Sequence, residues 1–192
     1  MGRWNHHQKR TNLSRIFAKR RICVAAFVFL GALLLRIGFG HASEAAAPVV
    51  GSWNIAVTAD EERERRESIN QATKNLRSMQ RNMARQMLER RTAPPEALRI
   101  ELDAPTVTIG SDDRELELEL GGAPIAFSGD DGTAQVRAKM DGDQLIVTAN
   151  GNNGGRTTSY RADGVRLSVF VSVTGSRLDG TVRYSTTYTR AE

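Results

Sequence analysis

The chain has 192 residues, and its 27 lysines and arginines against 22 aspartates and glutamates give it a formal charge of +5. Its histidines, His6, His7 and His41, and its one cysteine, Cys23, all lie near the amino terminus. The rest of the chain has neither imidazole nor thiol. Its composition therefore excludes zinc sites with nitrogen and sulfur ligands, Cys–His or Ser–His–Asp catalysis, thiol redox chemistry and disulfides.

Residues 1–43 are predicted to be a signal peptide or a membrane anchor. Basic residues without any acid precede an apolar run over 22–35, which is the pattern of a secretory signal. Small residues suited to cleavage follow at 40–42, 43–45 and 45–47. A membrane span needs about 20 apolar residues, so the short run favours a cleaved signal over an anchor at 22–39. Both alternatives predict export across the cytoplasmic membrane, with the rest of the chain in the periplasm.

The charge changes sign when this segment is set aside. Residues 1–42 hold eight basic residues and no acid, so 19 basic residues remain against 22 acidic ones, a charge of −3. A mildly acidic domain with few aromatic residues and no glycine-rich phosphate loop does not fit a nucleic-acid partner. The remaining length is sufficient for a conventional core, and we predict a single domain over 49–192.

The first two elements after the leader differ in their periodicity. Over 49–58, Trp53, Ile55 and Val57 alternate with polar or small residues, which predicts a strand with one buried face. Over 60–91 the apolar residues recur at steps of three and four: Ile69, Ala72, Leu76, Met79, Met83, Met87 and Leu88. This spacing predicts one long amphipathic helix, ended by Pro94-Pro95.

The rest of the chain has the alternation of short strands. The predicted segments are 99–102, 106–109, 115–120, 124–128, 134–140, 145–149, 157–161, 165–173 and 181–190. Asp-Gly and Asn-Gly pairs separate many of them, as tight hairpin turns require. We therefore predict a mainly β fold in which an antiparallel sheet, apolar on one face, curls into an up-and-down barrel or half-barrel with the helix against it.

The pattern of Gly51-x-Trp53 on the first strand, then a helix, then up-and-down strands ending in Tyr188-Thr189-Arg190 resembles the lipocalin (calycin) family. It is also similar to exported bacterial lipocalin-like proteins of unassigned function. The resemblance implies that Trp53 opens the barrel and that Arg190 packs over its indole as a structural pair. The helix after the first strand departs from the lipocalin order, in which the main helix follows the barrel.

Our leading hypothesis is an exported, non-enzymatic protein that binds a small apolar or amphipathic ligand inside the barrel. No cofactor and no metal is expected. The inward positions of the alternating strands predict the lining residues, which are Trp53, Val136, Val147, Val169, Val171, Tyr184 and Tyr188.

The helix supports an alternative, in which its surface docks on a membrane or a protein partner while the barrel is a platform. The residues predicted for this surface are Met79, Met83, Met87, Arg77, Arg81 and Arg85. A third hypothesis is a hydrolase that uses two carboxylates. Glu115, Glu117 and Glu119 share one strand face, but such a row is typical of protection of a sheet edge.

Overall fold

A computed structural model of the chain describes residues 48–112, 114–129 and 132–192. The predicted signal or anchor segment lies outside the described residues. The elements in chain order are β1 (Gly51–Ile55), α1 (Ala59–Ala72), α2 (Ser78–Thr92), β2 (Ala97–Asp103), β3 (Thr106–Ser111), β4 (Arg114–Glu119), β5 (Ile125–Gly129), β6 (Gly132–Asp141), β7 (Gln144–Gly151), β8 (Gly154–Asp163), β9 (Arg166–Gly175) and β10 (Val182–Arg190). Within this described part, neither α1 nor α2 has the length and hydropathy needed to cross a membrane.

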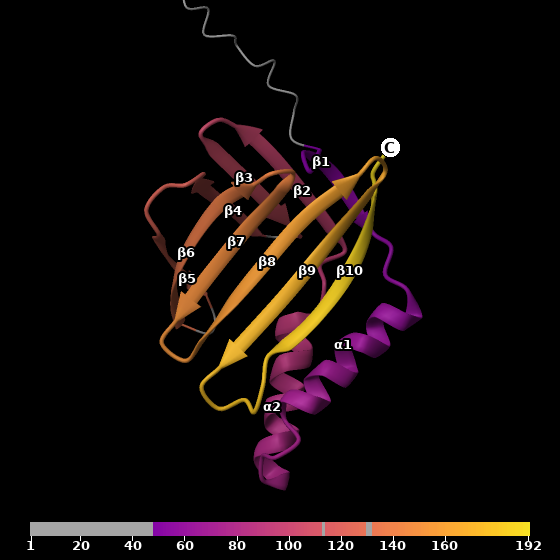
Figure 1. Cartoon of the computed structure of the whole chain (residues 1–192), viewed down its shortest axis with the longest axis vertical. Coiled ribbons are helices and arrows are strands. Elements are labelled where there is room, and N and C mark those ends of the chain that lie inside the picture. Colours follow the sequence, from indigo (N-terminus) through magenta and orange to yellow (C-terminus); the bar gives the residue numbers. More distant parts are fainter. Residues whose placement is uncertain (1–47, 113, 130–131) are drawn as a thin grey trace, which may run out of the picture. The chain divides into compact units, whose positions relative to one another are not determined.

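The strands form one antiparallel sheet in the order β4-β3-β2-β1-β10-β9-β8-β7-β6-β5. The first and last strands are neighbours, with Trp53 opposite Arg190. The two outermost strands, β4 and β5, are consecutive in sequence, and the residues after β4 return to the sheet. Leu120 forms an isolated bridge with Ala138 of β6, and the Gly121 amide donates to the Ala138 carbonyl at 2.9 Å. The sheet therefore curves into a nearly closed barrel (Figure 1), as predicted.

Tight turns join the consecutive strands of the carboxy-terminal half. Asp141 pairs with Gln144 and Asp163 pairs with Arg166, which leaves two-residue loops at 142–143 and 164–165. The first residue of each loop is a glycine with positive φ, 61° and 58°. Because a side chain at such an angle is strained, the glycines account for these turns.

The predicted single helix over 60–91 is wrong, because two helices occupy this segment. In a continuous helix the Ala72 carbonyl would accept from the Leu76 amide. Instead it accepts from the Asp179 amide of the β9–β10 loop at 3.0 Å, and the Leu76 amide donates to the Thr73 carbonyl at 3.2 Å. The Asp179 carboxylate also accepts from the Asn75 amide at 2.9 Å. The β9–β10 loop thus holds the break between α1 and α2.

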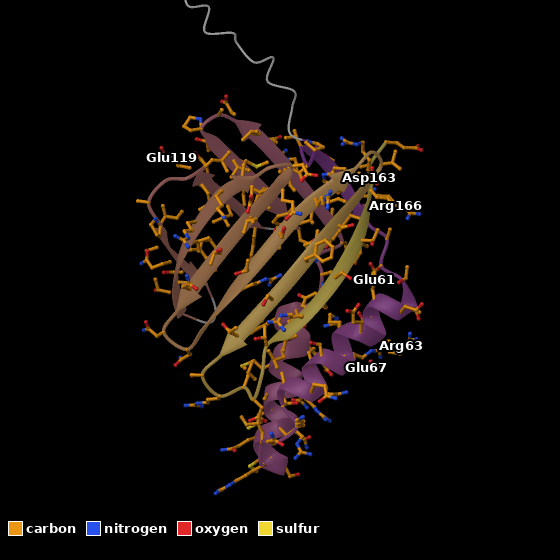
Figure 2. All side chains as sticks on the ribbon, in the orientation of Figure 1. Glu61, Arg63, Glu67, Glu119, Asp163 and Arg166 are labelled. Carbon is orange, nitrogen blue, oxygen red and sulfur yellow. The ribbon has the colours of Figure 1, made fainter. Side chains whose placement is uncertain are left out.

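Helix α1 lies along the part of β10 that β1 leaves unpaired. The Thr58 hydroxyl accepts from the Glu61 amide, and the Glu61 carboxylate accepts from the Thr58 amide, so a capping box begins the helix. Further along, the Ser68 hydroxyl accepts from the Arg183 amide of β10 at 2.8 Å. The Thr187 hydroxyl donates to Glu61 at 2.6 Å. Figure 2 shows Glu61, Arg63 and Glu67 along this helix, which protects the strand edge.

The core lies on the inward face of the barrel and under the helices. Its fully buried side chains, each under 2 % exposed, are Trp53, Tyr188, Ile69, Ile100, Leu145, Leu167, Val49, Val107, Val182, Thr73 and Thr92. Helix α1 contributes Ile69 and Ala72 to the core, whereas α2 contributes only Leu88 and the terminal Thr92. The greater part of α2 is therefore not packed into the core.

Candidate functional site

Trp53 and Arg190 meet where the first and last strands are paired. The Arg190 Cζ atom lies 4.3 Å from the centroid of the Trp53 ring, and its guanidinium donates to the Val50 and Pro48 carbonyls at 3.2 and 3.4 Å. The indole is fully buried and its Nε1 donates to the Val49 carbonyl at 3.0 Å. Gly51 has a φ of 143°, and a Cβ there would lie 2.5 Å from the Arg190 Nη1 atom. The backbone angle, which L side chains rarely adopt, together with the close guanidinium, thus explains the glycine of the Gly-x-Trp pattern.

The other predicted lining residues take inward positions on β6, β7, β9 and β10. The most exposed of them, Val147, is 8 % exposed. Val136 faces Ala149 across β6 and β7, and Val171 faces Tyr184 across β9 and β10. The register brings this group to one face, while Trp53 lies at the β1–β10 junction. Contact of any of these residues with a ligand stays a prediction.

Two inward tyrosines tie the barrel to the segment that follows α2. The Tyr184 hydroxyl donates to the Thr92 carbonyl at 3.0 Å, and the Tyr188 hydroxyl donates to the Pro95 carbonyl at 3.1 Å. Burial raises the pKa of both hydroxyls. Both side chains are therefore neutral donors. Tyr184 satisfies a carbonyl left free by the end of the helix, and Tyr188 satisfies a carbonyl of the loop that follows it.

Arg65 of α1 joins the two helices at the same end of α2. Its guanidinium donates to both oxygens of Glu62, at 2.6 and 3.1 Å, and to the Thr92 hydroxyl at 3.0 Å. It also donates to the Glu89 carbonyl at 3.3 Å. The hydrogen bond from Arg65 lowers the pKa of the Glu62 carboxyl, so the pair is charged near neutral pH.

Arg156 and Tyr160 of β8 are inward polar residues absent from the predicted lining. Arg156 donates to the Thr158 hydroxyl at 3.3 Å and to the Arg91 carbonyl of α2 at 3.2 Å. Tyr160 is 8 % exposed, burial raises its pKa, and its hydroxyl makes no hydrogen bond with the residues that the structure describes. The signal was available for Tyr160, which shares the alternation of Thr158 on the predicted strand 157–161. Arg156 lies one residue before that predicted strand, because β8 begins earlier, at Gly154.

The structure separates the methionines and arginines predicted for the docking surface. Met79 is 78 % exposed and Met83 is 68 % exposed. Arg81 and Arg85 are half-buried, and their Nε atoms are shielded from solvent without a hydrogen-bond partner. Met87 is also half-buried, and Arg77 is the exposed N-cap of α2. Partner binding by this helix stays a prediction.

The surface of the described residues includes hollows that are open to solvent. One, of about 500 Å³, lies over β1 to β4, and most of its lining residues take outward positions. Another, of about 400 Å³, lies between α1 and Arg183. Of the predicted ligand residues only Trp53 lines either hollow. Neither hollow therefore marks the predicted interior site.

The acidic residues of the described ranges form no group of three or more that could hold a metal ion. Glu115 instead pairs across the sheet with Arg99, at 3.6 Å between Nη2 and the carboxylate. Glu115, Glu117 and Glu119 all lie on β4, which is an end strand of the sheet. Their position agrees with protection of an edge.

Comparison with known proteins gives similarity in structure and none in sequence. No family model and no curated protein matches the chain. A secretory abundant heat soluble protein from Ramazzottius varieornatus, 12 % identical, has a TM-score of 0.51, with 75 % of this chain and 96 % of that chain covered. This likeness shows the fold alone.

Two further solved structures resemble the chain less closely. Fatty-acid-binding protein 1 of Echinococcus granulosus is 13 % identical with a TM-score of 0.48, over 76 % of this chain and 98 % of that chain. Lipid binding protein 8 of Caenorhabditis elegans is 12 % identical with a TM-score of 0.49, over 77 % and 98 %. The predicted resemblance implies a barrel of up-and-down antiparallel strands, and the chain forms such a nearly closed antiparallel barrel.

Proposed function

We propose that this protein binds a small apolar or amphipathic ligand within its barrel and does so without catalysing a reaction. The observation that supports this proposal is the incomplete burial of the inward face. Apolar side chains in inward positions that solvent still reaches are Ile55, Leu102, Leu116, Leu120, Phe127, Ala134, Met140, Ala149 and Val173. An apolar surface of this kind gains free energy when a ligand replaces water.

Tyr160 supports an amphipathic rather than a purely apolar ligand. Its hydroxyl makes no hydrogen bond to a described residue, and its raised pKa keeps it protonated. The oxygen is not among the shielded atoms that lack a partner, so solvent reaches it. A polar group of the ligand would replace water as its hydrogen-bond partner.

The test is displacement of a neutral fluorescent probe, N-phenyl-1-naphthylamine, together with mass spectrometry of the denatured protein for lipid that co-purifies. Ala149→Phe would fill the inward face and weaken probe binding by about tenfold or more, because the added ring occupies the ligand's volume. Thr148→Phe is the matched control, since Thr148 is the neighbouring outward residue of β7. Absence of probe binding by the unmodified protein, or equal weakening by both variants, would contradict the proposal.

Export to the periplasm is part of the proposal and is supported by the basic and apolar pattern of the leader. The measurement is the amino-terminal sequence of the protein purified from a cell-envelope extract. A mature protein that begins between residues 43 and 48 supports a cleaved signal. An intact amino terminus in the membrane fraction supports the anchor, and an intact protein in the cytoplasm contradicts export.

A second function, docking of α2 on an anionic membrane surface, is favoured by the exposure of Met79 and Met83. These thioethers are four residues apart and share one helix face. The helix carries four arginines against one acid, Glu89, which complements anionic lipid. Sedimentation with phosphatidylglycerol vesicles tests this function. We expect Met79→Ser with Met83→Ser to reduce binding, with Asn82→Ser as control, and no binding by the unmodified protein would exclude it.

A further inference from the structure

The outer surface of the barrel carries opposite charges on two groups of strands. The outward side chains of β6 to β10, which we call the basic wall, include five cations and two acids: Arg137, Lys139, Arg161, Arg166 and Arg183, with Asp141 and Asp163. The outward side chains of β2 to β4, the acidic wall, include one cation and five acids: Arg99, with Glu101, Asp103, Glu115, Glu117 and Glu119. The charge of the domain is therefore segregated rather than mixed.

The two walls lie on opposite sides of the barrel. In the sheet order β1 lies between them, and Figure 1 shows β2, β3 and β4 behind β6, β7 and β8. A contact between two basic walls, or between two acidic walls, would bring like charges together. A contact between the basic wall of one copy and the acidic wall of another brings opposite charges together, and the opposite placement leaves both walls of every copy accessible.

Several charged side chains of each wall have no ion-pair partner among the described residues. They are Arg137, Arg166 and Arg183 on the basic wall, and Asp103, Glu117 and Glu119 on the acidic wall. Arg99 is different, because it pairs with Glu101 at 3.3 Å and with Glu115 at 3.6 Å. The like charges of Glu117 and Glu119 repel each other on one strand face. A surface of opposite charge would relieve this repulsion.

The basic wall also has an exposed aromatic residue, Phe170 of β9, which is 51 % exposed. It lies opposite Ser159 of β8 and Ser185 of β10, with Arg161 and Arg183 at diagonal positions. Its other neighbours on this face are serines and threonines, which lose little side-chain entropy in a contact. Aromatic residues and arginines are the types enriched in protein interfaces.

The acidic wall has space for a projecting side chain. The hollow of about 500 Å³ over β1 to β4 extends onto this wall. Gly110 of β3 lies there between Arg99 and Glu115 and has no side chain of its own. An aromatic ring from a neighbouring molecule would therefore meet a depression rather than a flat sheet.

We propose that copies of this protein associate head to tail, with the basic wall and Phe170 of one copy docked on the acidic wall of the next. Such a contact is heterologous, so it builds a ring or an open row of copies rather than a closed pair. The walls face outward, and the inference is therefore independent of ligand binding inside the barrel.

The experiment is sedimentation velocity of the protein purified from a cell-envelope extract. Association is expected at about 0.02 M ionic strength and should weaken by about tenfold or more at about 0.5 M, because salt screens exposed charges. Glu117→Lys with Glu119→Lys reverses charge on the acidic wall, and Arg137→Glu with Lys139→Glu reverses charge on the basic wall. Each double variant alone is expected to associate about tenfold or more weakly. A mixture of the two is expected to associate again, since each then carries the charge that the other lacks.

Matched controls separate the walls from the rest of the surface. Arg77→Glu with Arg90→Glu changes the net charge as much as the basic-wall variant, but both residues are exposed on α2, outside the walls. This variant is expected to associate like the unmodified protein. Phe170→Ser is expected to weaken association by about tenfold, whereas Val165→Ser, at an exposed residue of the β8–β9 turn, is expected to leave it unchanged.

Two results would overturn the inference. One is an unmodified protein that stays monomeric at about 0.02 M ionic strength at every concentration tested. The other is a mixture of the two reversed variants that associates no better than either variant alone. Circular dichroism checks the fold of each variant, and the salt dependence of the unmodified protein tests the inference without any substitution.

Discussion

Arg190 shows how one side chain joins the first and last strands of the sheet. It packs on Trp53 of β1, and its guanidinium donates to the two carbonyls of Pro48 and Val50 that precede the strand. Because β1 has only five residues, its backbone ladder to β10 is short. The cation–π contact and the two hydrogen bonds therefore stabilise the pairing of β1 with β10 beyond what the short backbone ladder provides.

Arg190→Gln is expected to lower the free energy of unfolding by about 1 kcal/mol, since it removes an exposed cation–π contact and two hydrogen bonds to carbonyls. Urea denaturation followed by circular dichroism measures the change. Arg183→Gln is the control, because Arg183 is an exposed arginine of the same strand with an outward side chain. Equal stability of the two variants would show that the Trp53 contact contributes nothing.

Glu62 gives a pH-dependent prediction. Its folded-state pKa lies below the ordinary value of 4.5 because Arg65 donates to the carboxylate. The stability from this pair is therefore present above about pH 4.5 and lost as the pH falls through the folded-state pKa. Glu62→Gln is expected to destabilise the protein by about 1 kcal/mol at about pH 7 and to match the unmodified protein at about pH 2. Urea midpoints across this range measure it, with Glu64→Gln as control.

The two helices differ in how they are held. Helix α1 is capped at Thr58 and bonded to the edge of β10, whereas α2 is attached through Leu88, Thr92 and their neighbours at its end. The break between them rotates the second part of the apolar repeat. Met79 and Arg81 are separated by about 200° around the axis of α2. Arg81 and Arg85 therefore share the helix face of Leu88, whereas Met79 and Met83 lie on the face exposed to solvent.

This arrangement predicts that Met79→Ser with Met83→Ser changes the unfolding free energy by less than about 0.5 kcal/mol, because both side chains are already in water. Leu88→Ala on the same helix is expected to cost about 2 kcal/mol or more, since it removes a buried side chain. Thermal unfolding of the two variants side by side checks both values. A large loss from the methionine change would mean that they pack as core residues.

At the scale of the whole molecule, the tyrosine side chains all lie in the interior of the barrel. The chain has three tyrosines, and Tyr160, Tyr184 and Tyr188 all lie on the inward face. Burial raises the pKa of each above the ordinary value of 10. All three therefore remain protonated in the folded protein when an unfolded chain would already lose protons.

Stability is accordingly expected to be independent of the tyrosines below about pH 10 and to fall above it, because only the unfolded state ionises there. The measurement is tyrosinate absorbance during alkaline titration, compared with far-ultraviolet circular dichroism. We expect the absorbance to rise only as the fold is lost. Tyrosinate that forms near pH 10 in the folded protein, as it does in a urea-unfolded control, would contradict this interior.

Much of the strand pattern was predictable from local chemistry. Alternation assigned Val136, Val147, Val169 and Val171 to one face, because side chains in a strand alternate whatever the partner. Glycines such as Gly142 marked the turns, because the backbone angle there excludes side chains at low cost. The same alternation contained Tyr160, but it could not reveal that the tyrosine hydroxyl lacks a protein partner, since partners come from distant strands.

The sequence by itself determined the antiparallel strands, their inward and outward faces and the absence of imidazole and thiol after residue 41. Only the tertiary structure decided where the helix breaks, because the Asp179 amide, distant in sequence, takes the Ala72 carbonyl. That break in turn decided which helix face meets the barrel. Periodicity describes a continuous helix correctly but cannot carry its phase across an interruption. The half-buried positions of Arg81 and Arg85, and the exposure of Met79 and Met83 to solvent, are therefore properties of the fold.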